Sequence, residues 1–314
     1  MKVGIVGVGA VGATTAYALV MRGVGSDIVL VDIDKSRAWA EAQDIAHAVP
    51  FAHPARVSAG DYPDLSGSRV VIIAAGTARK PGESRLELLS RNADIFRAIV
   101  PEIILYAPET VLLVATNPVD IMTHITADTA AAQNIPNSRV IGSGTTLDTA
   151  RFRALLGQHL GIDPHHVHGY VIGEHGDSEV IPWSLASVGG VPLDEFALQI
   201  ENPLGSDIKE TIDQQVRYAG KNIIQGKGRT NYGIGSALVR IVEVILKDQR
   251  ALLTVCTPVP EIAGIPNVTV SMPHLVGGAG IRNTFLLPLA LTQKEENALH
   301  ASAKVVKEAY ERIR

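Results

Sequence analysis

The sequence predicts an α/β protein in which a doubly wound parallel sheet is followed by an α+β domain. In the first half, short apolar runs alternate with stretches of helical periodicity. These runs are apolar throughout, which indicates strands covered on both faces, as in a parallel sheet between two layers of helices. In the second half, helical patterns dominate and strand candidates are shorter. A chain of 314 residues, 46% of them hydrophobic, is long enough for two such domains.

The first half follows the order strand, helix, strand, which is typical of a parallel sheet wound on both sides. The expected strands are Val3–Val6, Ile28–Val31, Val70–Ala75, Val111–Ala115 and Val140–Ile141, and the expected helices cover Ala13–Met21 and Glu87–Tyr106. The segment Gly142-Ser143-Gly144 interrupts this pattern. We therefore expect one domain over residues 1–142 and a second over residues 143–314.

The second half reads as helices with a few short strands. Helices are expected at Thr149–Leu160, Ile208–Ile224 and Ser236–Leu246, and strands at Val167–Ile172, Leu252–Val255 and Val268–Val270. The last helix has the clearest pattern, since one apolar stripe recurs every three or four residues through Leu299, Ala303, Val306, Tyr310 and Ile313. Thr292 and Glu295 have the spacing of a capping box at its start.

Composition excludes several classes of protein. Charged residues make up 19% of the chain and the net charge is -4, which excludes a disordered chain and a basic nucleic-acid binder. The single cysteine, Cys256, excludes an internal disulfide and thiolate metal clusters. The group His165, His166 and His168 has no acid or thiol in view to complete a metal site, so no metal is expected. No apolar run approaches the ~20 residues of a membrane span, and the N-terminus lacks the order of a signal peptide, so we expect a cytoplasmic protein.

A glycine-rich segment, Gly7-Val8-Gly9-Ala10-Val11-Gly12, follows the first strand and opens a helix. The first glycine permits a tight turn, the second lets the backbone approach a pyrophosphate, and the third lets helix and strand pack closely. The helix N-terminus then offers N–H groups and a positive dipole to the phosphates. This order is that of a Rossmann dinucleotide-binding unit. The alternative is that the glycines only form a turn and bind no ligand.

An acid stands where such a unit needs one. Asp32 ends the second strand, 20 residues after Gly12. Its carboxylate can accept hydrogen bonds from ribose hydroxyls and would repel a 2′-phosphate, and no cation follows before Lys35. This favours NAD over NADP. The alternative is a solvated carboxylate at a strand end.

Two further segments carry groups for acid–base and anion chemistry. His175 lies in Gly173-Glu174-His175-Gly176-Asp177-Ser178, and Asp148 and Arg151 lie three residues apart at the start of an expected helix, hence on one face. A carboxylate beside a histidine fixes its tautomer and raises its pKa, and an arginine fork binds a carboxylate through two hydrogen bonds. The alternative without a function is a histidine of the core and an ordinary ion pair on the surface.

The segment from Gly76 to Arg85 follows an expected strand at its carboxyl end. It contains three cations, a proline and two glycines, which suits a loop that closes over an anion. A solvated basic loop is the alternative.

These motifs together resemble the lactate/malate dehydrogenase family over essentially the whole chain, most closely bacterial L-lactate dehydrogenases and lactate-dehydrogenase-like malate dehydrogenases. The matching segments are Gly7–Gly12, Asp32, Lys80-Pro81-Gly82-Glu83-Ser84-Arg85, Thr116-Asn117-Pro118-Val119-Asp120, Leu147–Arg153 and Gly173–Ser178. The resemblance implies an NAD-dependent oxidoreductase with a Rossmann domain and a C-terminal substrate domain.

The resemblance also implies a role for each matching residue. His175 is the acid/base that protonates the ketone oxygen, Asp148 pairs with it, and Arg85 on the closing loop polarises the carbonyl. Arg151 binds the substrate C1 carboxylate, and Asn117 orients substrate and nicotinamide. The residues implied in binding NAD are Gly7, Gly9, Val11, Gly12, Asp32, Thr77 and Asn117, and those implied in binding substrate are Arg79, Arg85, Asn117, Arg151 and Thr230.

Arg79 bears on the choice of hydroxy acid. In the family, the residue six before the loop arginine reads the substrate side chain, and arginine there is the malate pattern. Arg79 can bind the second carboxylate of oxaloacetate, whereas pyruvate would leave a desolvated guanidinium unpaired. Glu83 and Thr230 follow the lactate pattern instead. We therefore expect malate dehydrogenase activity, with L-lactate dehydrogenase activity as the alternative.

The resemblance implies two further properties. Arg153 and His168 fall where many bacterial lactate dehydrogenases bind fructose 1,6-bisphosphate across a subunit interface. They can equally be ordinary residues of a helix and a strand end. A homotetramer is expected, with a dimer as the lesser option. Neither a nucleic acid nor a membrane is expected as a partner.

Overall fold

The computed structural model describes residues 1–77, 82, 84–283 and 290–313. The strands are β1 Lys2–Val6, β2 Asp27–Val31, β3 Arg56–Ala59, β4 Ser68–Ile73, β5 Val111–Val114, β6 Val140–Gly142, β7 Val167–His168, β8 Ser187–Val188, β9 Val191–Pro192, β10 Ala251–Ile262, β11 Ile265–Gly277 and β12 Gly280–Asn283. The helices are α1 Ala10–Arg22, α2 Lys35–Ala48, α3 Arg85–Tyr106, α4 Val119–Ala131, α5 Thr146–Leu160, α6 Leu193–Gln199, α7 Ser206–Arg217, α8 Ala219–Lys227, α9 Tyr232–Leu246 and α10 Gln293–Glu311.

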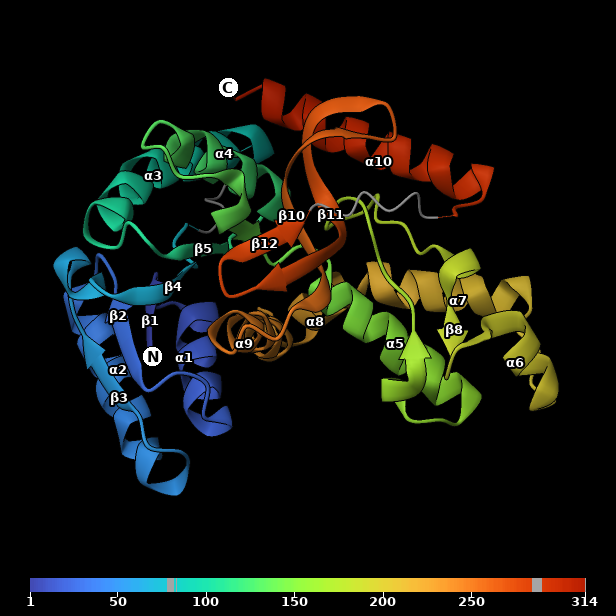
Figure 1. Cartoon of the computed structure of the whole chain (residues 1–314), viewed down its shortest axis with the longest axis horizontal. Coiled ribbons are helices and arrows are strands. Elements are labelled where there is room, and N and C mark those ends of the chain that lie inside the picture. Colours follow the sequence, from blue (N-terminus) through green and yellow to red (C-terminus); the bar gives the residue numbers. More distant parts are fainter. Residues whose placement is uncertain (78–81, 83, 284–289, 314) are drawn as a thin grey trace.

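A nine-stranded sheet forms the centre of the molecule, in the order β12-β11-β10-β6-β5-β4-β1-β2-β3 (Figure 1). The strands from β3 to β6 pair in parallel, and β10, β11 and β12 add to β6 in antiparallel fashion. The reversal between β1 and β4 is the strand order of a dinucleotide-binding fold. The predicted doubly wound sheet and the Rossmann fold of the first half are therefore confirmed.

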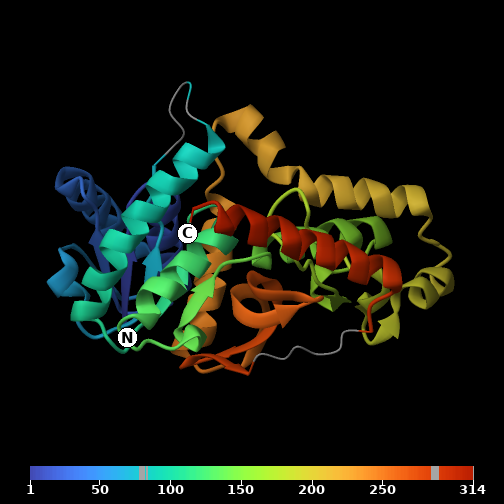
Figure 2. The same cartoon turned by 90° about the horizontal axis from the view of Figure 1, so that it is seen from above.

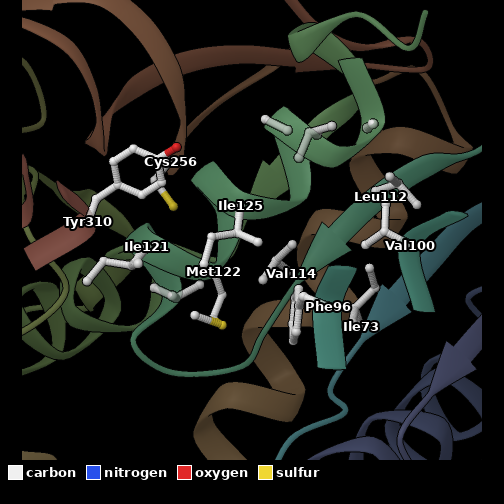
Figure 3. Packing of buried hydrophobic residues seen from close by; sticks show 14 of the residues in the cluster. Ile73, Phe96, Val100, Leu112, Val114, Ile121, Met122, Ile125, Cys256 and Tyr310 are labelled. Atoms are coloured by element: carbon white, nitrogen blue, oxygen red, sulfur yellow. The ribbon is translucent and has the colours of Figure 1, made fainter. Parts of the chain in front are cut away.

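Both faces of the parallel sheet are covered, as the apolar strands predict. On β4, Val71 and Ile73 pack with Phe96 of α3 and with α4, as Figure 3 shows for Ile73 and Phe96. The alternate residues Val70 and Ile72 pack in a second cluster with α1, α2 and α9. Successive side chains of a strand point to opposite faces, so a strand between two helical layers has to be apolar at every position.

The second half holds a long hairpin that the sequence prediction underestimated. Instead of two short strands, β10 and β11 pair along almost their whole length, from Ala251↔Val276 to Ile262↔Ile265. Prolines such as Pro258 break the apolar runs in the sequence, but the pairing continues through them. At Cys256, β10 pairs with Gly142 of β6. The large sheet therefore continues past residue 142, where the border between the domains was expected.

Other sequence predictions for the second half need correction. The helix expected at Ile208–Ile224 is two helices, because Tyr218 ends α7 and precedes α8 with a φ of -97° and a ψ of 4°. The strand expected at Val167–Ile172 is reduced to β7 and an isolated bridge between Ile172 and Val180. Elements without an expected counterpart include β3, α2, α4, α6 and β12.

The C-terminal helix forms as predicted. Thr292 and Glu295 make the capping box, and the stripe from Leu299 to Tyr310 is buried. Figure 2 shows α10 running along the molecule beside the β10–β11 hairpin, and the helix also contacts α4. In this way α10 joins the second half of the chain to the first. None of the described helices is both long enough and apolar enough to span a membrane.

Candidate active site

A cavity of about 570 Å³ lies at the carboxyl ends of β1, β2 and β4. It is lined by Gly7 and Gly9 after β1, Asp32 after β2, and Gly76 and Thr77 after β4. Open α/β sheets bind their ligands at this edge, where the strand order reverses. The rest of the lining includes aliphatic and aromatic side chains, namely Ile33, Tyr62, Ile95 and Ile99. A glycine-rich wall and an apolar wall suit a ligand with both phosphates and a flat base.

The glycine-rich loop has the geometry of a phosphate cradle. Gly7 has a φ of +95°, which glycine adopts without strain. Gly9 is the N-cap of α1, and a Cβ there would meet no atom within 4 Å, so its backbone faces open space. A Cβ on Gly12 would lie 2.0 Å from the Gly7 carbonyl oxygen. The loop thus fits a pyrophosphate at the N-terminus of α1.

Asp32 is held in place at this cavity by backbone N–H groups. Its carboxylate accepts hydrogen bonds from the N–H of Val8 at 2.6 Å and of Asp34 at 2.9 Å. Carboxylate oxygens have further lone pairs, which ribose hydroxyls can use. Two cations also line the cavity, but Lys35 pairs with Asp61, and Arg37 lies 3.8 Å from Asp34. Because both already face carboxylates, this arrangement fits NAD better than NADP.

Of the other residues predicted to bind the cofactor, only Thr77 lies at this cavity. Thr77 lines the cavity, and its N–H donates to Asn92 Oδ1 at 3.0 Å. Val11 packs against the apolar core in the first turn of α1, Gly12 is buried, and Asn117 is exposed between β5 and α4. The structure therefore brings Gly7, Gly9, Asp32 and Thr77 to the cavity and leaves Val11, Gly12 and Asn117 out of its lining.

Three predicted residues meet in one cluster. Asp148 Oδ2 lies 2.5 Å from His175 Nδ1, and Asp148 Oδ1 accepts a hydrogen bond from Arg151 Nη1 at 2.7 Å. Asp148 and Arg151 share one face of α5, as their spacing predicts. The Asp148 side chain is 2% exposed, whereas His175 and Arg151 are 25% and 19% exposed. The carboxylate is therefore buried beneath an imidazole and a guanidinium that both reach the surface.

The loop that carries His175 is braced at its base. Ile172 and Val180 exchange two hydrogen bonds of 2.8 Å, and Gly173 pairs with Ser271 of β11. Within the loop, the Glu174 carboxylate accepts hydrogen bonds from Ser178. This bracing holds His175 in a fixed position without a regular strand.

Two acids that the sequence analysis gave no role lie beside His175. Asp120, in the first turn of α4, accepts a hydrogen bond from the backbone N–H of His175 at 2.8 Å. Asp120 and Glu179 are only 2% and 4% exposed. An acid shortly after a strand that ends at the ligand edge was a usable signal for Asp120. Nothing local in the sequence distinguishes Glu179 from the many exposed glutamates.

The charges around His175 keep it protonated. Burial lowers the pKa of His175, but the charge and hydrogen bond of Asp148, with the charges of Asp120 and Glu179, outweigh this and raise it to about 9. Burial opposes ionisation of Asp148, yet His175 and Arg151 hold its pKa below its usual value. Near neutral pH the pair is therefore an imidazolium and a carboxylate. Asp148 occupies Nδ1, which leaves Nε2 to exchange a proton with a ligand.

Of the residues predicted to bind substrate, Arg151 belongs to this cluster. Thr230 is half-buried in the turn before α9. The prediction for Arg79 lies outside the described residues, and so does the side chain of Arg85, although its backbone begins α3.

Of the two residues predicted for regulation, Arg153 lines a described cavity and His168 is not part of that lining. Arg153 Nε donates to the Gly169 carbonyl at 3.1 Å, and its guanidinium lies 5.9 Å from the centre of the Tyr170 ring. It lines a cavity of about 660 Å³ together with Arg22 and Arg240. His168 is exposed on β7 and is not part of that lining.

The histidine group near β7 differs from the expectation in one respect. An acid does lie beside it, because Asp163 Oδ1 is 2.7 Å from His165 Nδ1. Both side chains are largely exposed. Within the described ranges, no group of three or more His, Cys, Asp or Glu side chains is arranged to hold a metal ion.

Comparison with known proteins places the chain in a family. Residues 1–142 match the NAD binding domain of lactate/malate dehydrogenase, and residues 145–314 match the alpha/beta C-terminal domain of the same family. An L-lactate dehydrogenase of Geotalea daltonii is 58% identical over 313 residues, which are 100% of this chain and 99% of that protein. An L-lactate dehydrogenase of Thermus aquaticus is 53% identical over 98% of both chains.

A solved structure agrees with this relationship. The minor L-lactate dehydrogenase from Enterococcus mundtii superposes with a TM-score of 0.94 at 37% identity, covering 100% of this chain and 98% of the other. The dinucleotide cradle and the His175–Asp148 pair thus occur in a chain that matches these proteins from end to end. The chain belongs to the lactate/malate dehydrogenase family, as an NAD-dependent dehydrogenase.

Proposed function

We propose that the protein is an L-lactate dehydrogenase, which interconverts pyruvate and L-lactate with NAD and uses His175 as its acid/base. The observation that carries this proposal is the 2.5 Å contact between His175 Nδ1 and Asp148 Oδ2, beside Arg151. Relatives that are 43–58% identical bear the name L-lactate dehydrogenase, which favours lactate as the substrate. Arg79 predicts malate instead.

In the direction of reduction, His175 gives a proton from Nε2 to the ketone oxygen. Because its pKa is raised to about 9, the imidazole carries this proton at neutral pH. Asp148 stabilises the charged imidazole before the transfer and fixes its orientation. Bound NAD in its reduced form supplies the hydride for the carbonyl carbon. In the direction of oxidation, neutral His175 takes the proton back, so this direction requires a higher pH.

Arg151 holds the substrate carboxylate. One of its N–H groups binds Asp148, and the others make no hydrogen bond to the described residues. A guanidinium that is anchored on one side and 19% exposed can bind a carboxylate through two hydrogen bonds on the other. Arg85, Asn117 and Thr230 complete the site in this proposal, with Arg85 polarising the carbonyl when its loop closes.

Malate dehydrogenase activity is the second candidate function, and Arg79 is the observation in its favour. A guanidinium at this position pairs with the second carboxylate of oxaloacetate, whereas the methyl group of pyruvate leaves it without a partner. The test is kcat/KM for NADH oxidation with pyruvate and with oxaloacetate. A higher value for pyruvate supports lactate dehydrogenase, and a preference for oxaloacetate of tenfold or more, about 1.4 kcal/mol, replaces it with the second candidate.

The proposal includes assembly and regulation. We infer domains over residues 1–142 and 143–314, a homotetramer rather than a dimer, and binding of fructose 1,6-bisphosphate near Arg153 and His168. The cavity of about 660 Å³ beside Arg153 supports this binding, because Arg22 and Arg240 also line it and share a single carboxylate, Glu243, which leaves net positive charge. The test is the substrate KM and the molar mass in solution with and without fructose 1,6-bisphosphate. If neither changes, the regulatory part of the proposal is wrong.

A further inference from the structure

Among the described residues, three buried carboxyl groups act on His175 through their charge, and they differ in their own partners. Asp148 is paired with both His175 and Arg151. Asp120 and Glu179 are as deeply buried, but Asp120 Oδ1 and Glu179 Oε1 have no hydrogen-bond partner within the described residues. Burying a carboxylate without a nearby cation costs much free energy, and this cost disappears when the group binds a proton.

We propose that Asp120 and Glu179 are positioning residues of the active site, which act through His175. When either carboxyl loses its proton, its negative charge raises the pH at which His175 releases its own proton. Neither touches substrate or cofactor in this proposal. The inference rests on the proposed role of His175 as acid/base and adds two groups that control when it can serve.

Asp120 acts from the side of α4. Its Oδ2 accepts the backbone N–H of His175 at 2.8 Å, which places its charge next to the imidazole-bearing residue. The other ionisable groups that face it are Glu174 and Cys256. Burial raises the pKa of the Cys256 thiol well above its usual value, so this group stays neutral. Burial also raises the pKa of Asp120, to about 7, so Asp120 gains its negative charge near neutral pH.

Glu179 acts from the end of the loop that carries His175. The groups whose charges reach it are His175 and Asp148 on one side, and Arg217 and Asp213 of α7 on the other. Arg217 is committed to Asp213, with N···O distances of 2.8 and 3.0 Å. Burial and the charge of Asp148 raise the pKa of Glu179 to about 8.

Glu179 also has a route for its proton. It lines a cavity of about 570 Å³ that is bounded by Arg217 and Asp213 of α7 and by Lys294 of α10. Several of these lining side chains are exposed, so solvent can exchange a proton with the buried carboxyl. The cavity therefore brings solvent next to the carboxyl that has to titrate.

The two carboxyls extend the pH range of the imidazolium. Both ionise before His175 does, since their pKa values of about 7 and 8 lie below the value of about 9 for His175. Each new negative charge then stabilises the protonated imidazole. Reduction of the oxo acid, which needs this proton, is thereby maintained into alkaline solution.

The test is the pH profile of kcat/KM for pyruvate and NADH in the wild type, Asp120→Asn, Glu179→Gln and the double variant. Asparagine at position 120 keeps an oxygen that accepts the His175 N–H, so that only the charge is lost. We expect the midpoint of the alkaline decline to fall by about one pH unit in each single variant and further in the double variant. The value below about pH 6, where both carboxyls are protonated, should change less than twofold.

Two controls separate charge from structure. Glu210→Gln removes an exposed carboxylate that lines the same cavity, and it should leave the midpoint where it is. Glu179→Asp keeps a carboxyl group at this position, so its midpoint should lie between the midpoints of Glu179→Gln and the wild type. A midpoint that stays unmoved in both charge variants, or a loss of activity in equal proportion at every pH, would overturn the proposal.

A measurement on the wild type covers the case in which the variants do not fold. The infrared difference spectrum of the wild type between about pH 6 and pH 9 should lose protonated carboxyl bands, since ordinary carboxyls have already ionised near pH 4. Absence of such bands contradicts the proposal. If His175→Gln leaves the alkaline decline unchanged, the proposed role of His175 fails. If the decline requires His175 but no charge variant moves it, only the present inference fails.

Discussion

Asp120 accepts a hydrogen bond from the backbone N–H of His175 at 2.8 Å. Asp120 lies on α4, which follows β5 of the parallel sheet, whereas His175 belongs to the second half of the chain. This contact therefore ties the backbone of the acid/base to α4, in addition to the bonds that brace its loop on β11. Because the contact is made by the backbone of His175, the imidazole is left to Asp148.

Asp120→Ala should impair catalysis more than binding. The change removes the acceptor for the His175 N–H, and leaving a buried donor unpaired costs about 1–3 kcal/mol. We expect kcat to fall about tenfold or more while the Kd for NADH stays within twofold. Steady-state rates and fluorescence titration with NADH measure the two effects. Asp120→Asn, which retains an acceptor, is the matched control, and equal losses in both variants would show that the hydrogen bond has no role in positioning.

Gly9→Ala and Gly12→Ala should separate cofactor binding from folding. A methyl group on Gly9 meets no protein atom and points into the space expected for the pyrophosphate, so it should raise the Kd for NADH at least tenfold and leave stability unchanged. A methyl group on Gly12 would lie 2.0 Å from the Gly7 carbonyl oxygen, so it should destabilise the fold by about 1–3 kcal/mol. Calorimetric titration and thermal unfolding decide between these effects. An unaltered NADH affinity in Gly9→Ala would place the cofactor elsewhere.

Stability should fall as the pH rises from about 7 to about 9. The pKa of His175 is raised from 6.5 to about 9, so its stabilisation is complete below pH 6.5 and is lost as the pH passes 9. Asp120 and Glu179 also lower stability as the pH rises, but over a lower range, because the folded state keeps their protons only up to about pH 7 for Asp120 and about pH 8 for Glu179. We expect a loss of roughly 2 kcal/mol from His175 alone in urea unfolding across this range. A His175→Gln variant should show a smaller decline, and an identical decline would contradict the assignment.

Arg79→Gln should shift the substrate preference toward pyruvate. The change removes the cation that the sequence offers to a second carboxylate, so we expect kcat/KM for oxaloacetate to fall at least tenfold. The value for pyruvate should rise or stay the same, because no guanidinium then remains unpaired. Parallel assays with both oxo acids measure the ratio. A ratio that does not change would show that Arg79 has no part in reading the substrate side chain.

The sequence predicted those parts of the fold and site that depend on local pattern. The parallel strands follow from runs that are apolar at every position, and the phosphate loop follows from glycines between a strand and a helix. Asp148 and Arg151 could be paired because three residues along a helix share a face. Local pattern does not report how far β-pairing extends through prolines such as Pro258, so the β10–β11 hairpin was predicted too short.

The missing parts of the site depend on contacts between distant segments. The sequence separates Asp120 from His175 by 55 residues, and only the packed fold reveals their hydrogen bond. The charges that act on Glu179 likewise come from distant segments, namely from Asp148 of α5 and from Arg217 and Asp213 of α7. Sequence patterns can therefore identify the reacting residues more readily than the residues that hold and tune them.

In the proposed mechanism, the imidazole paired with Asp148 delivers the proton to the oxo acid. The decisive experiment on this step is the rate of NADH oxidation with pyruvate by His175→Gln, measured at saturating NADH near pH 7. We expect kcat/KM to fall by about 100-fold or more, with the Kd for NADH unchanged, because glutamine cannot donate the proton. A variant that keeps more than about a tenth of the wild-type rate would show that another group supplies it.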